Sequence, residues 1–357
     1  MSPALTDVIA SVAARLHPGM AEDSLGLPDA TRYVVVLIDG LGWSNLKAYP
    51  GLAPTLERME ATALTVGVPS TTATSLAALT TGADAAQHGL VGFSFRSRPG
   101  VIMQTMKWDD KALAPEAAQP VPTWFERLDC ESAVVVPAKF AGSGLTRAVL
   151  RGADFVGVTN EKAWDDRVAQ AAEVAAGHAL TYVYERNLDH VGHLKGWRSP
   201  AWQAHLARVD AFVASLASAV PAGTCLLVTA DHGMVDTPVT HRVTLEFEPQ
   251  LAQGVDLVAG EARLRHLYTA DPAGVAARWA SWWGSRAEVR VRADALTWFG
   301  ESPPSPDVAA RIGDVVVALL DDWAALTTTR PKEMSLVGLH GSITAGERIV
   351  PLLKGSP

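Results

Sequence analysis

The feature that most constrains the fold of this 357-residue chain is a series of short apolar runs that alternate with longer stretches of helical pattern. Each run is rich in β-branched residues, is bounded by turn residues and has the length of a strand. The predicted core strands cover residues 33–38, 133–137, 180–185 and 224–229. Helices are expected at 53–61, 74–80, 162–176 and 200–218. This alternation predicts an α/β fold, with a largely parallel central sheet and helices on both faces.

Carboxylate, imidazole and hydroxyl side chains accompany these runs. Asp39 closes VVVLIDG, Asp231 and His232 close CLLVTADHGM, Asp189 and His193 lie in NLDHVGHLKG, His340 lies in LVGLHGS, and Thr72 lies in VPSTTATSLAALTTG. Ligands of open α/β sheets bind at the carboxyl edge, where such strand ends meet. Three Asp and three His suit a pair of zinc-like ions. With a hydroxyl nucleophile, they describe a two-metal site for phosphoryl transfer.

Each of these residues also has an ordinary structural interpretation. Asp39 after its apolar run has the position of a carboxylate that caps a helix, and the same holds for Asp231. Asp189 and His193 are spaced i, i+4, on one face of a helical turn, although Gly192 weakens the expectation of a regular helix. His340 alone is more often structural. The metal-site interpretation is favoured because several strand ends carry such residues together.

In this order, and with a T-G-x5-H-G segment from Thr81 to Gly89, the motifs resemble the alkaline phosphatase superfamily, and within it the nucleotide pyrophosphatase/phosphodiesterase branch. The resemblance runs from Asp39 to His340. It implies an alkaline-phosphatase-like fold and two divalent ions, zinc or else manganese, with no further cofactor. One ion would be bound by Asp189, His193 and His340, and the other by Asp39, Asp231 and His232. Thr72 would bridge toward the second ion.

Four hydroxyl side chains compete for the role of nucleophile: Ser70, Thr71, Thr72 and Thr74. In the family pattern, the nucleophilic threonine lies three positions after a proline and ten before the glycine of the T-G pair. Pro69 and Gly82 both select Thr72. A free hydroxyl is a poor nucleophile until a cation lowers its pKa. The resemblance therefore implies a metal-dependent hydrolase of phosphodiester or pyrophosphate bonds that forms a covalent phosphothreonine.

Two positions depart from the family pattern. Nucleotide-cleaving relatives carry an aromatic residue after the nucleophile, where this chain has Ala73, and an asparagine four residues after the HG glycine, where it has Phe93. The first change weakens the expectation of a nucleotide substrate. The second removes a donor to a phosphate oxygen, which in such a site costs about 3 kcal/mol. The basic residues in the segment that follows are Arg96, Arg98 and Lys107, and such loop residues are usually solvated.

The same set of residues is also compatible with other functions. A phosphomonoesterase and a phosphonate hydrolase share the metal set. A sulfatase is disfavoured, since no C/S-x-P-x-R sequence is present at the nucleophile. A metal-binding protein with a lapsed active site is the alternative outside enzymes, and Thr72 argues against it. His190 and His88 are interpreted as outer-shell or structural residues.

Composition narrows the class of partner. A net charge of −8 argues against nonspecific binding to nucleic acid or to an anionic membrane, so a small-molecule phosphate ester or pyrophosphate is expected. No run reaches the roughly 18 apolar residues of a membrane helix, and the N-terminus lacks the pattern of a signal peptide. Cys130 and Cys225 are expected as free thiols. Together these features predict a cytoplasmic location, and they leave the oligomeric state open.

The metal-type motifs stop between 241 and 331. Strands are expected at 262–268 and 288–292, around a helix at 272–283. This predicts a small α+β insertion at 241–331 within a catalytic core of residues 1–240 and 332–357. Its tryptophans are interpreted as packing residues: Trp279, Trp282, Trp283 and Trp298. The apolar run from Arg311 fits either a strand or a helix.

Overall fold

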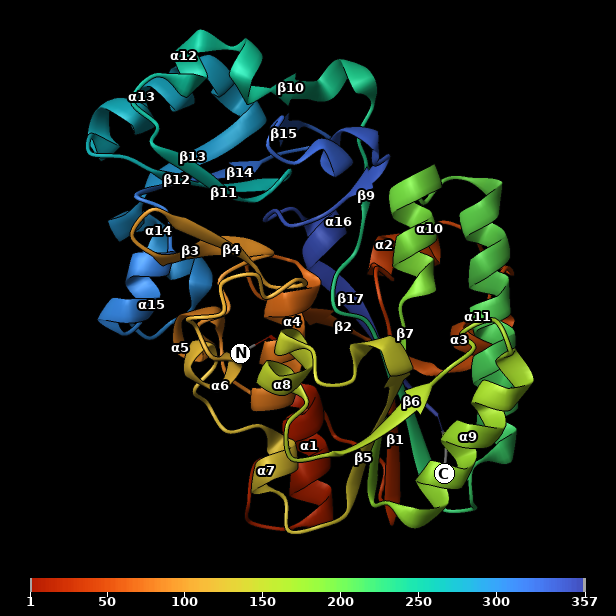
Figure 1. The fold of residues 1–357 in the computed structure, drawn as a ribbon. Coiled ribbons are helices and arrows are strands. Elements are labelled where there is room, and N and C mark those ends of the chain that lie inside the picture. Colours follow the sequence, from red (N-terminus) through yellow and green to blue (C-terminus); the bar gives the residue numbers. More distant parts are fainter. Residues whose placement is uncertain (1, 356–357) are drawn as a thin grey trace.

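A seven-stranded sheet forms the centre of the molecule in the computed structural model, which describes residues 2–355 (Figure 1). The strand order is β2-β17-β8-β1-β7-β5-β6. The strands are β1 (Arg32–Ile38), β2 (Glu60–Thr65), β5 (Ser132–Pro137), β6 (Asp154–Val158), β7 (Leu180–Glu185), β8 (Thr224–Thr229) and β17 (Ile349–Lys354). Strands β8, β1, β7, β5 and β6 are parallel, whereas β17 runs antiparallel to β8 and β2. The predicted largely parallel α/β sheet is confirmed.

The register of the middle strands places the functional strand ends together. In β1, residue Tyr33 pairs with Leu180 of β7 and with Cys225 of β8. All six residues of β8 are buried, as are those of β1 after Arg32, which matches their continuous apolar sequence. Parallel strands in register end at the same edge. The segments that follow β1, β7 and β8 therefore emerge side by side.

Helices cover both faces of this sheet (Figure 1). Helix α11 packs against α9, α10 and α3 on one face, and α4 packs against α1, α7 and α8 on the other. Their bounds are α1 (Asp7–Leu16), α3 (Pro54–Arg58), α4 (Thr72–Thr81), α7 (Trp124–Arg127), α8 (Gly144–Val149), α9 (Trp164–Gly177), α10 (Asn187–Lys195) and α11 (Pro200–Ala219). The remaining short helices of the core are α2 (Trp43–Lys47), α5 (Ala85–His88), α6 (Pro115–Ala118), η1 (Ala138–Phe140) and α16 (Ala345–Arg348).

A second, antiparallel sheet lies beyond the carboxyl edge of the first, in the order β11-β12-β14-β13. Its strands are β11 (Leu257–Glu261), β12 (Leu264–Tyr268), β13 (Ala287–Val291) and β14 (Val315–Leu319). Its helices are α12 (Pro249–Ala252), α13 (Pro272–Trp283), α14 (Arg292–Phe299) and α15 (Pro306–Arg311). Trp279 and Trp283 are buried in an apolar cluster of this part, as expected of packing residues. The division of the chain at 241 and 331 stays a prediction.

Among the described residues, the other strands form short two-stranded sheets. They are β3 (Ser94–Arg98) with β4 (Val101–Gln104), β9 (Val235–Asp236) with β16 (Gly338–Leu339), and β10 (Arg242–Thr244) with β15 (Ala324–Leu326). The remaining single turns are η2 (Val239–His241), η3 (Leu245–Phe247), η4 (Gly284–Arg286) and η5 (Pro331–Ser335). Cys130 and Cys225 are free thiols. Within residues 2–355, every helix is too short or too polar to cross a membrane.

Two local predictions were wrong in their bounds. The helix expected at 53–61 ends at Arg58, and the chain continues as strand β2. Four of the six residues of β2 are good helix formers, namely Glu60, Ala61, Ala63 and Leu64, and the strand conformation comes from pairing with β17 at the other end of the chain. The helix expected from residue 74 begins at Thr72. The run from Arg311, left open by its pattern, contains strand β14.

Candidate metal centre

Two groups of three ligand-type side chains meet at the carboxyl edge of the central sheet. We call them the first group (Asp189, His193 and His340) and the second group (Asp39, Asp231 and His232). In each group, one oxygen or nitrogen atom from every residue lies within 4.8 Å of the others. The structure thus brings together all six predicted ligands, in the two sets that the resemblance implied.

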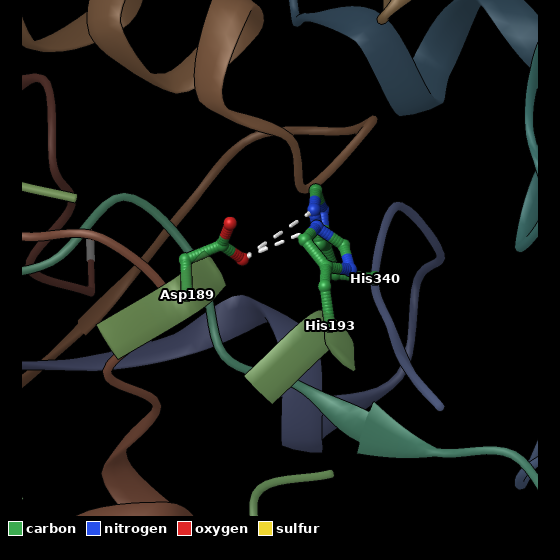
Figure 2. Close-up of side chains that lie close together, drawn as sticks. All are labelled: Asp189, His193 and His340. Atoms are coloured by element: carbon green, nitrogen blue, oxygen red, sulfur yellow. Dashed lines mark ion pairs between the residues drawn. The ribbon is translucent and has the colours of Figure 1, made fainter. Parts of the chain in front are cut away.

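Helix α10 supplies two residues of the first group (Figure 2). His193 Nε2 lies 3.3 Å from Asp189 Oδ1, and His340 Nε2 reaches the same oxygen at 4.0 Å. The helix is regular through Gly192, contrary to the doubt that the sequence raised. A Cβ atom on Gly192 would lie 2.4 Å from Met234 Sδ, so glycine allows α10 to pack closely against the segment beside it. This packing places Asp189 and His193 on the face toward His340.

The second group comes from the ends of β1 and β8. Asp39 directly follows β1, and Asp231 and His232 follow β8. The backbones of the two following turns touch: a Cβ atom on Gly233 would lie 2.1 Å from the carbonyl oxygen of Gly346 and 3.0 Å from Gly42 Cα. Only glycine fits between these backbone atoms. Gly42 and Gly233 therefore allow the turns after β1 and β8 to lie at contact distance.

The three histidines share one orientation. In each, Nδ1 lies at hydrogen-bond distance from a backbone carbonyl: His193 at 2.7 Å from Gly338, His232 at 3.0 Å from Gly233, and His340 at 3.0 Å from Ser70. A carbonyl only accepts, so each Nδ1 carries the proton and each Nε2 offers its lone pair to the centre. Metal-binding histidines usually have such an outer partner. Burial, followed by neighbouring His232 and His193, lowers the pKa of His340 well below its usual range, which keeps this ring neutral.

The carboxylates have unsatisfied oxygens inside the centre. Among the described residues, Asp39 Oδ1, Asp189 Oδ1 and Asp231 Oδ2 are buried and accept no hydrogen bond. Asp231 Oδ1, by contrast, accepts from the backbone of Gly40 at 3.1 Å. Burial, together with the charges of Asp231 and Asp189, raises the pKa of Asp39 well above its usual range. Buried carboxylates with free oxygens, together with neutral imidazoles, fit two divalent cations. A cation would offset the cost of burying the carboxylate charge and would give the free oxygens a partner.

Thr72 lies at the edge of the second group, as the first residue of helix α4. Its hydroxyl lies 3.2 Å from His232 Nε2. The neighbouring hydroxyls of Ser70 and Thr74 instead donate to the carbonyls of Ser342 and Leu90. The N-terminus of a helix favours a phosphate through its free amides and its dipole. Thr72 therefore has the placement that an attacking hydroxyl needs.

A cavity of about 230 Å³, which we call the metal-side cavity, opens onto both groups. Phe93 lines it and is only half-buried, so this side chain faces the centre and not the core. Arg96 and Arg98 bond elsewhere, to Ala310 and Asp110. The exposed Lys107 is not among the lining residues. None of these three basic residues therefore takes the place of the missing phosphate donor in this cavity.

His190, interpreted from the sequence as an outer-shell or structural residue, also lines this cavity. Two further polar lining residues were not predicted from the sequence to have a role there: Tyr184 and Arg186. The Tyr184 hydroxyl donates to Asp39 Oδ2. The Arg186 guanidinium bonds to Glu161 at 2.8 Å. Their positions at the end of β7 and the start of α10 were the available signal, since both elements lead into Asp189. His88 is fully buried away from the centre, and burial lowers its pKa to about 3, which suits a structural role.

The family model described as type I phosphodiesterase / nucleotide pyrophosphatase matches residues 33–343, which include both groups and Thr72. The chain belongs to this family. Membership confirms the prediction of a phosphoric ester hydrolase in the alkaline phosphatase superfamily. No curated protein sequence matches the chain.

Solved structures with the same fold include ectonucleotide pyrophosphatase/phosphodiesterases and a phosphonoacetate hydrolase. Murine ectonucleotide pyrophosphatase/phosphodiesterase 5 has a TM-score of 0.72 at 18% identity, with 91% of this chain and 88% of that chain covered. Its human counterpart has a TM-score of 0.71 at 17% identity, with the same coverage. Phosphonoacetate hydrolase from Sinorhizobium meliloti has a TM-score of 0.69 at 19% identity, with 92% and 91% covered. At these identities, the likeness shows the fold of this family member.

Proposed function

We propose that this family member hydrolyses phosphodiester or pyrophosphate bonds through a covalent phosphothreonine at Thr72, with two zinc-like ions held by the two groups. The observation that carries the proposal is the placement of the Thr72 hydroxyl, 3.2 Å from His232 Nε2 and at the N-terminus of α4. Zinc, or else manganese, would supply positive charge that lowers the pKa of a bound hydroxyl and offsets charge on the phosphoryl oxygens.

The residues of the chain have separate roles in this proposal. Thr72 attacks phosphorus in line, and the free amides of the first turn of α4 bind the phosphoryl oxygens. Tyr184 holds Asp39 by its hydrogen bond, and the carbonyls of Gly338, Gly233 and Ser70 hold the three imidazoles. These contacts fix the ligand atoms before substrate arrives, which reduces the reorganisation that the reaction requires. Water then releases the product from Thr72.

The lining of the metal-side cavity favours a diester over a monoester. A monoester dianion presents three unesterified oxygens and gains from every donor around it, whereas a diester presents two and carries a second organic group. Phe93 supplies apolar surface at the position where relatives have a donor. We infer that diesters or pyrophosphate-linked compounds are the better substrates.

A phosphonate hydrolase is the second candidate. Phosphonoacetate hydrolase has the same fold, and two of its structures hold phosphonoformate and phosphonoacetate. One structure of the murine nucleotide pyrophosphatase/phosphodiesterase is a complex of an inactive form with AMP. Arg186 is the basic residue of this chain that would meet a carboxylate beside the phosphoryl group, although it already bonds to Glu161. A phosphonate that carries a carboxylate would therefore share the Arg186 guanidinium with Glu161.

The nucleophile assignment is tested with a matched pair of variants. Thr72→Ala should lower kcat on a chromogenic diester by about a thousandfold or more, because the attacking oxygen is lost. It should retain metal content, and acid quenching should trap no phosphorylated protein. Thr71→Ala, one residue earlier, should retain turnover within about tenfold and still form the phosphothreonine. Equal losses in both variants would refute the role of Thr72.

A further inference from the structure

A second cavity of about 340 Å³ adjoins the candidate metal centre, and we call it the apolar cavity. It lies between the start of α4, the end of β5, helix α8 and strand β7. Its wall consists mainly of aliphatic and aromatic side chains, among them Leu76, Val136, Leu145, Val149 and Leu150. Its volume is at the lower end of the range of about 300–1,000 Å³ for small-molecule sites. It is large enough for one compact group.

The apolar cavity and the metal-side cavity meet at the proposed nucleophile. Four residues line both of them: Thr72, Met106, Phe140 and Tyr184. The two spaces are therefore neighbouring compartments of one substrate site. A molecule whose phosphoryl group lies beside Thr72 has the metal-binding groups on one side and the apolar wall on the other.

Polar groups in the apolar cavity are few and mostly occupied. The Lys139 ammonium pairs with Glu161 at 2.7 Å, and the Ser143 hydroxyl donates to Thr146 Oγ1 at 3.0 Å. The wall contains no carboxylate or carboxamide side chain. The hydroxyl of the fully buried Tyr182 has no hydrogen-bond partner among the described residues. Among the described lining residues, the Tyr182 hydroxyl and the exposed Lys139 ammonium, which has a single partner, retain hydrogen-bonding capacity, and most of the remaining surface is apolar. This lining does not match the several polar edges of a nucleobase.

The direction of attack decides which part of a substrate this cavity holds. In an in-line displacement, the leaving oxygen departs on the side of phosphorus opposite the attacking oxygen. Thr72 lines the apolar cavity as well as the metal-side cavity, so a group held next to Thr72 has access to the apolar wall. The group that stays bonded to phosphorus remains next to Thr72 in the covalent intermediate. This retained group, and not the leaving group, is the part that reaches the apolar wall.

On the basis of the proposed diester hydrolysis, we propose that the apolar cavity binds the retained organic group of the substrate, and that this group is a compact aryl or branched alkyl substituent. The physical reason is the free energy gained when apolar surface leaves water for a wall of matching character. A nucleoside would leave its base and ribose without hydrogen-bond partners there, and unpaired buried polar groups are costly.

The first test compares three p-nitrophenyl diesters on the zinc-loaded full-length protein. All share the leaving group, and the retained group is methyl, phenyl or thymidin-5′-yl. We expect kcat/KM for the phenyl diester to exceed that of each of the other two by roughly tenfold or more. Equal values for methyl and phenyl, or a preference for the thymidyl diester, would overturn the proposal and leave diester hydrolysis itself intact.

The second test uses variants that alter the apolar cavity. Leu145→Trp adds bulk inside it, and we expect the ratio of phenyl to methyl kcat/KM to fall to near one. Val239→Trp adds the same bulk at a side chain that is 80% exposed and outside the site, and it should leave the ratio unchanged. A ratio that Leu145→Trp does not change would contradict the assignment of this wall to the substrate.

A binding measurement separates the cavity from the reaction. Calorimetric titration of the zinc-loaded protein should give a dissociation constant for phenylphosphonate at least about fivefold below that for methylphosphonate, with Leu145→Trp removing the difference. If none of the diesters is hydrolysed with zinc or manganese, the proposed function fails. This titration still tests whether the apolar cavity binds the organic group attached to phosphorus. Equal affinities for the two phosphonates would refute the binding of this organic group in the apolar cavity.

Discussion

The imidazole rings of His232 and His340 are stacked, with centroids 3.6 Å apart and planes inclined by 14°. The two residues belong to different three-residue groups, so this contact is where the two groups meet. Both rings direct Nε2 into the centre and Nδ1 to a backbone carbonyl. Two protonated imidazoles at this distance would repel each other. The stacking therefore disfavours a doubly protonated pair, and the lowered pKa of His340 favours the neutral imidazole, which is the form that binds a metal ion.

Metal content is the first prediction. The two groups supply two sets of three protein ligands, so the zinc-supplemented protein should contain two ions per chain by elemental analysis. Zinc should also raise the melting temperature of chelator-treated protein, because it binds only the folded state. His340→Ala should retain about one ion, since the second group stays complete. A wild-type content well under one ion per chain would contradict the centre.

Asp39 gives a prediction for the metal-free protein. Burial and the charges of Asp231 and Asp189 raise the pKa of Asp39, so its ionised form destabilises the fold above its unfolded pKa. Asp39→Asn removes this charge and keeps an oxygen for the Tyr184 hydroxyl. We expect the metal-free variant to be more stable than metal-free wild type by about 1 kcal/mol in urea unfolding at pH 7. In excess zinc, wild type should be more stable than the variant, because the variant has lost a metal ligand.

Phe93 should control the balance between diesters and monoesters. Phe93→Asn introduces a donor at the wall of the metal-side cavity, and we expect monoester kcat/KM to rise so that the diester-to-monoester ratio falls by about tenfold. The side chain is half-buried, so the melting temperature should change little. Lost stability with an unchanged ratio would show that Phe93 only packs.

The backbone contact at Gly233 should be intolerant of a side chain. Gly233→Ala places a methyl group 2.1 Å from the Gly346 carbonyl oxygen, and neither atom belongs to a flexible side chain. We expect a loss of about 3 kcal/mol in the free energy of unfolding. Zinc affinity should fall with it, because β1 and β8 no longer present their ligands together. Gly177→Ala, where a Cβ atom meets nothing within 4 Å, is the control.

His266 should make the fold sensitive to acid. Its ring is fully buried, and its Nδ1 accepts from the Gly313 amide at 3.0 Å, which requires a neutral imidazole. Burial lowers its pKa from 6.5 to about 4. The unfolded state therefore binds the extra proton first, and stability falls as the pH drops from 6.5 toward 4, by about 3 kcal/mol in total. His266→Gln should show a shallower loss over this range in urea titrations. An unchanged pH dependence would contradict this role.

The middle of the sheet and the ligand groups were predictable for different reasons. Strands β1 and β8 are buried on both faces, so their sequences are apolar at residues 33–38 and 225–228, and the β-branched and aromatic residues of β7 mark it as a strand as well. The ligands were predicted because each follows the end of such a strand or belongs to a short motif. The choice of Thr72 among four hydroxyls came from spacing, and the structure places it against His232.

The remaining features depend on contacts between distant segments. Strand β2 has a helix-like composition and takes its conformation from pairing with β17. Tyr184 alternates with buried residues of β7, and no local pattern shows that its hydroxyl reaches Asp39. The apolar cavity combines side chains of α4, α8 and β7, whose sequences are those of ordinary packing elements. Such a space becomes visible only when the elements are placed relative to one another.

His340 is the last of the six ligand-type residues in the chain, and it lies after the whole second sheet. During synthesis, the first five can approach one another while the sixth is still in the ribosome or unfolded. The first group then lacks a ligand, and β17, which separates β8 from β2 in the sheet, is also missing. Completion of the centre therefore coincides with completion of the sheet. The first group therefore has all three of its ligands only in a chain that has also folded the segment leading into β17, so the affinity for a divalent ion there is coupled to closure of the sheet.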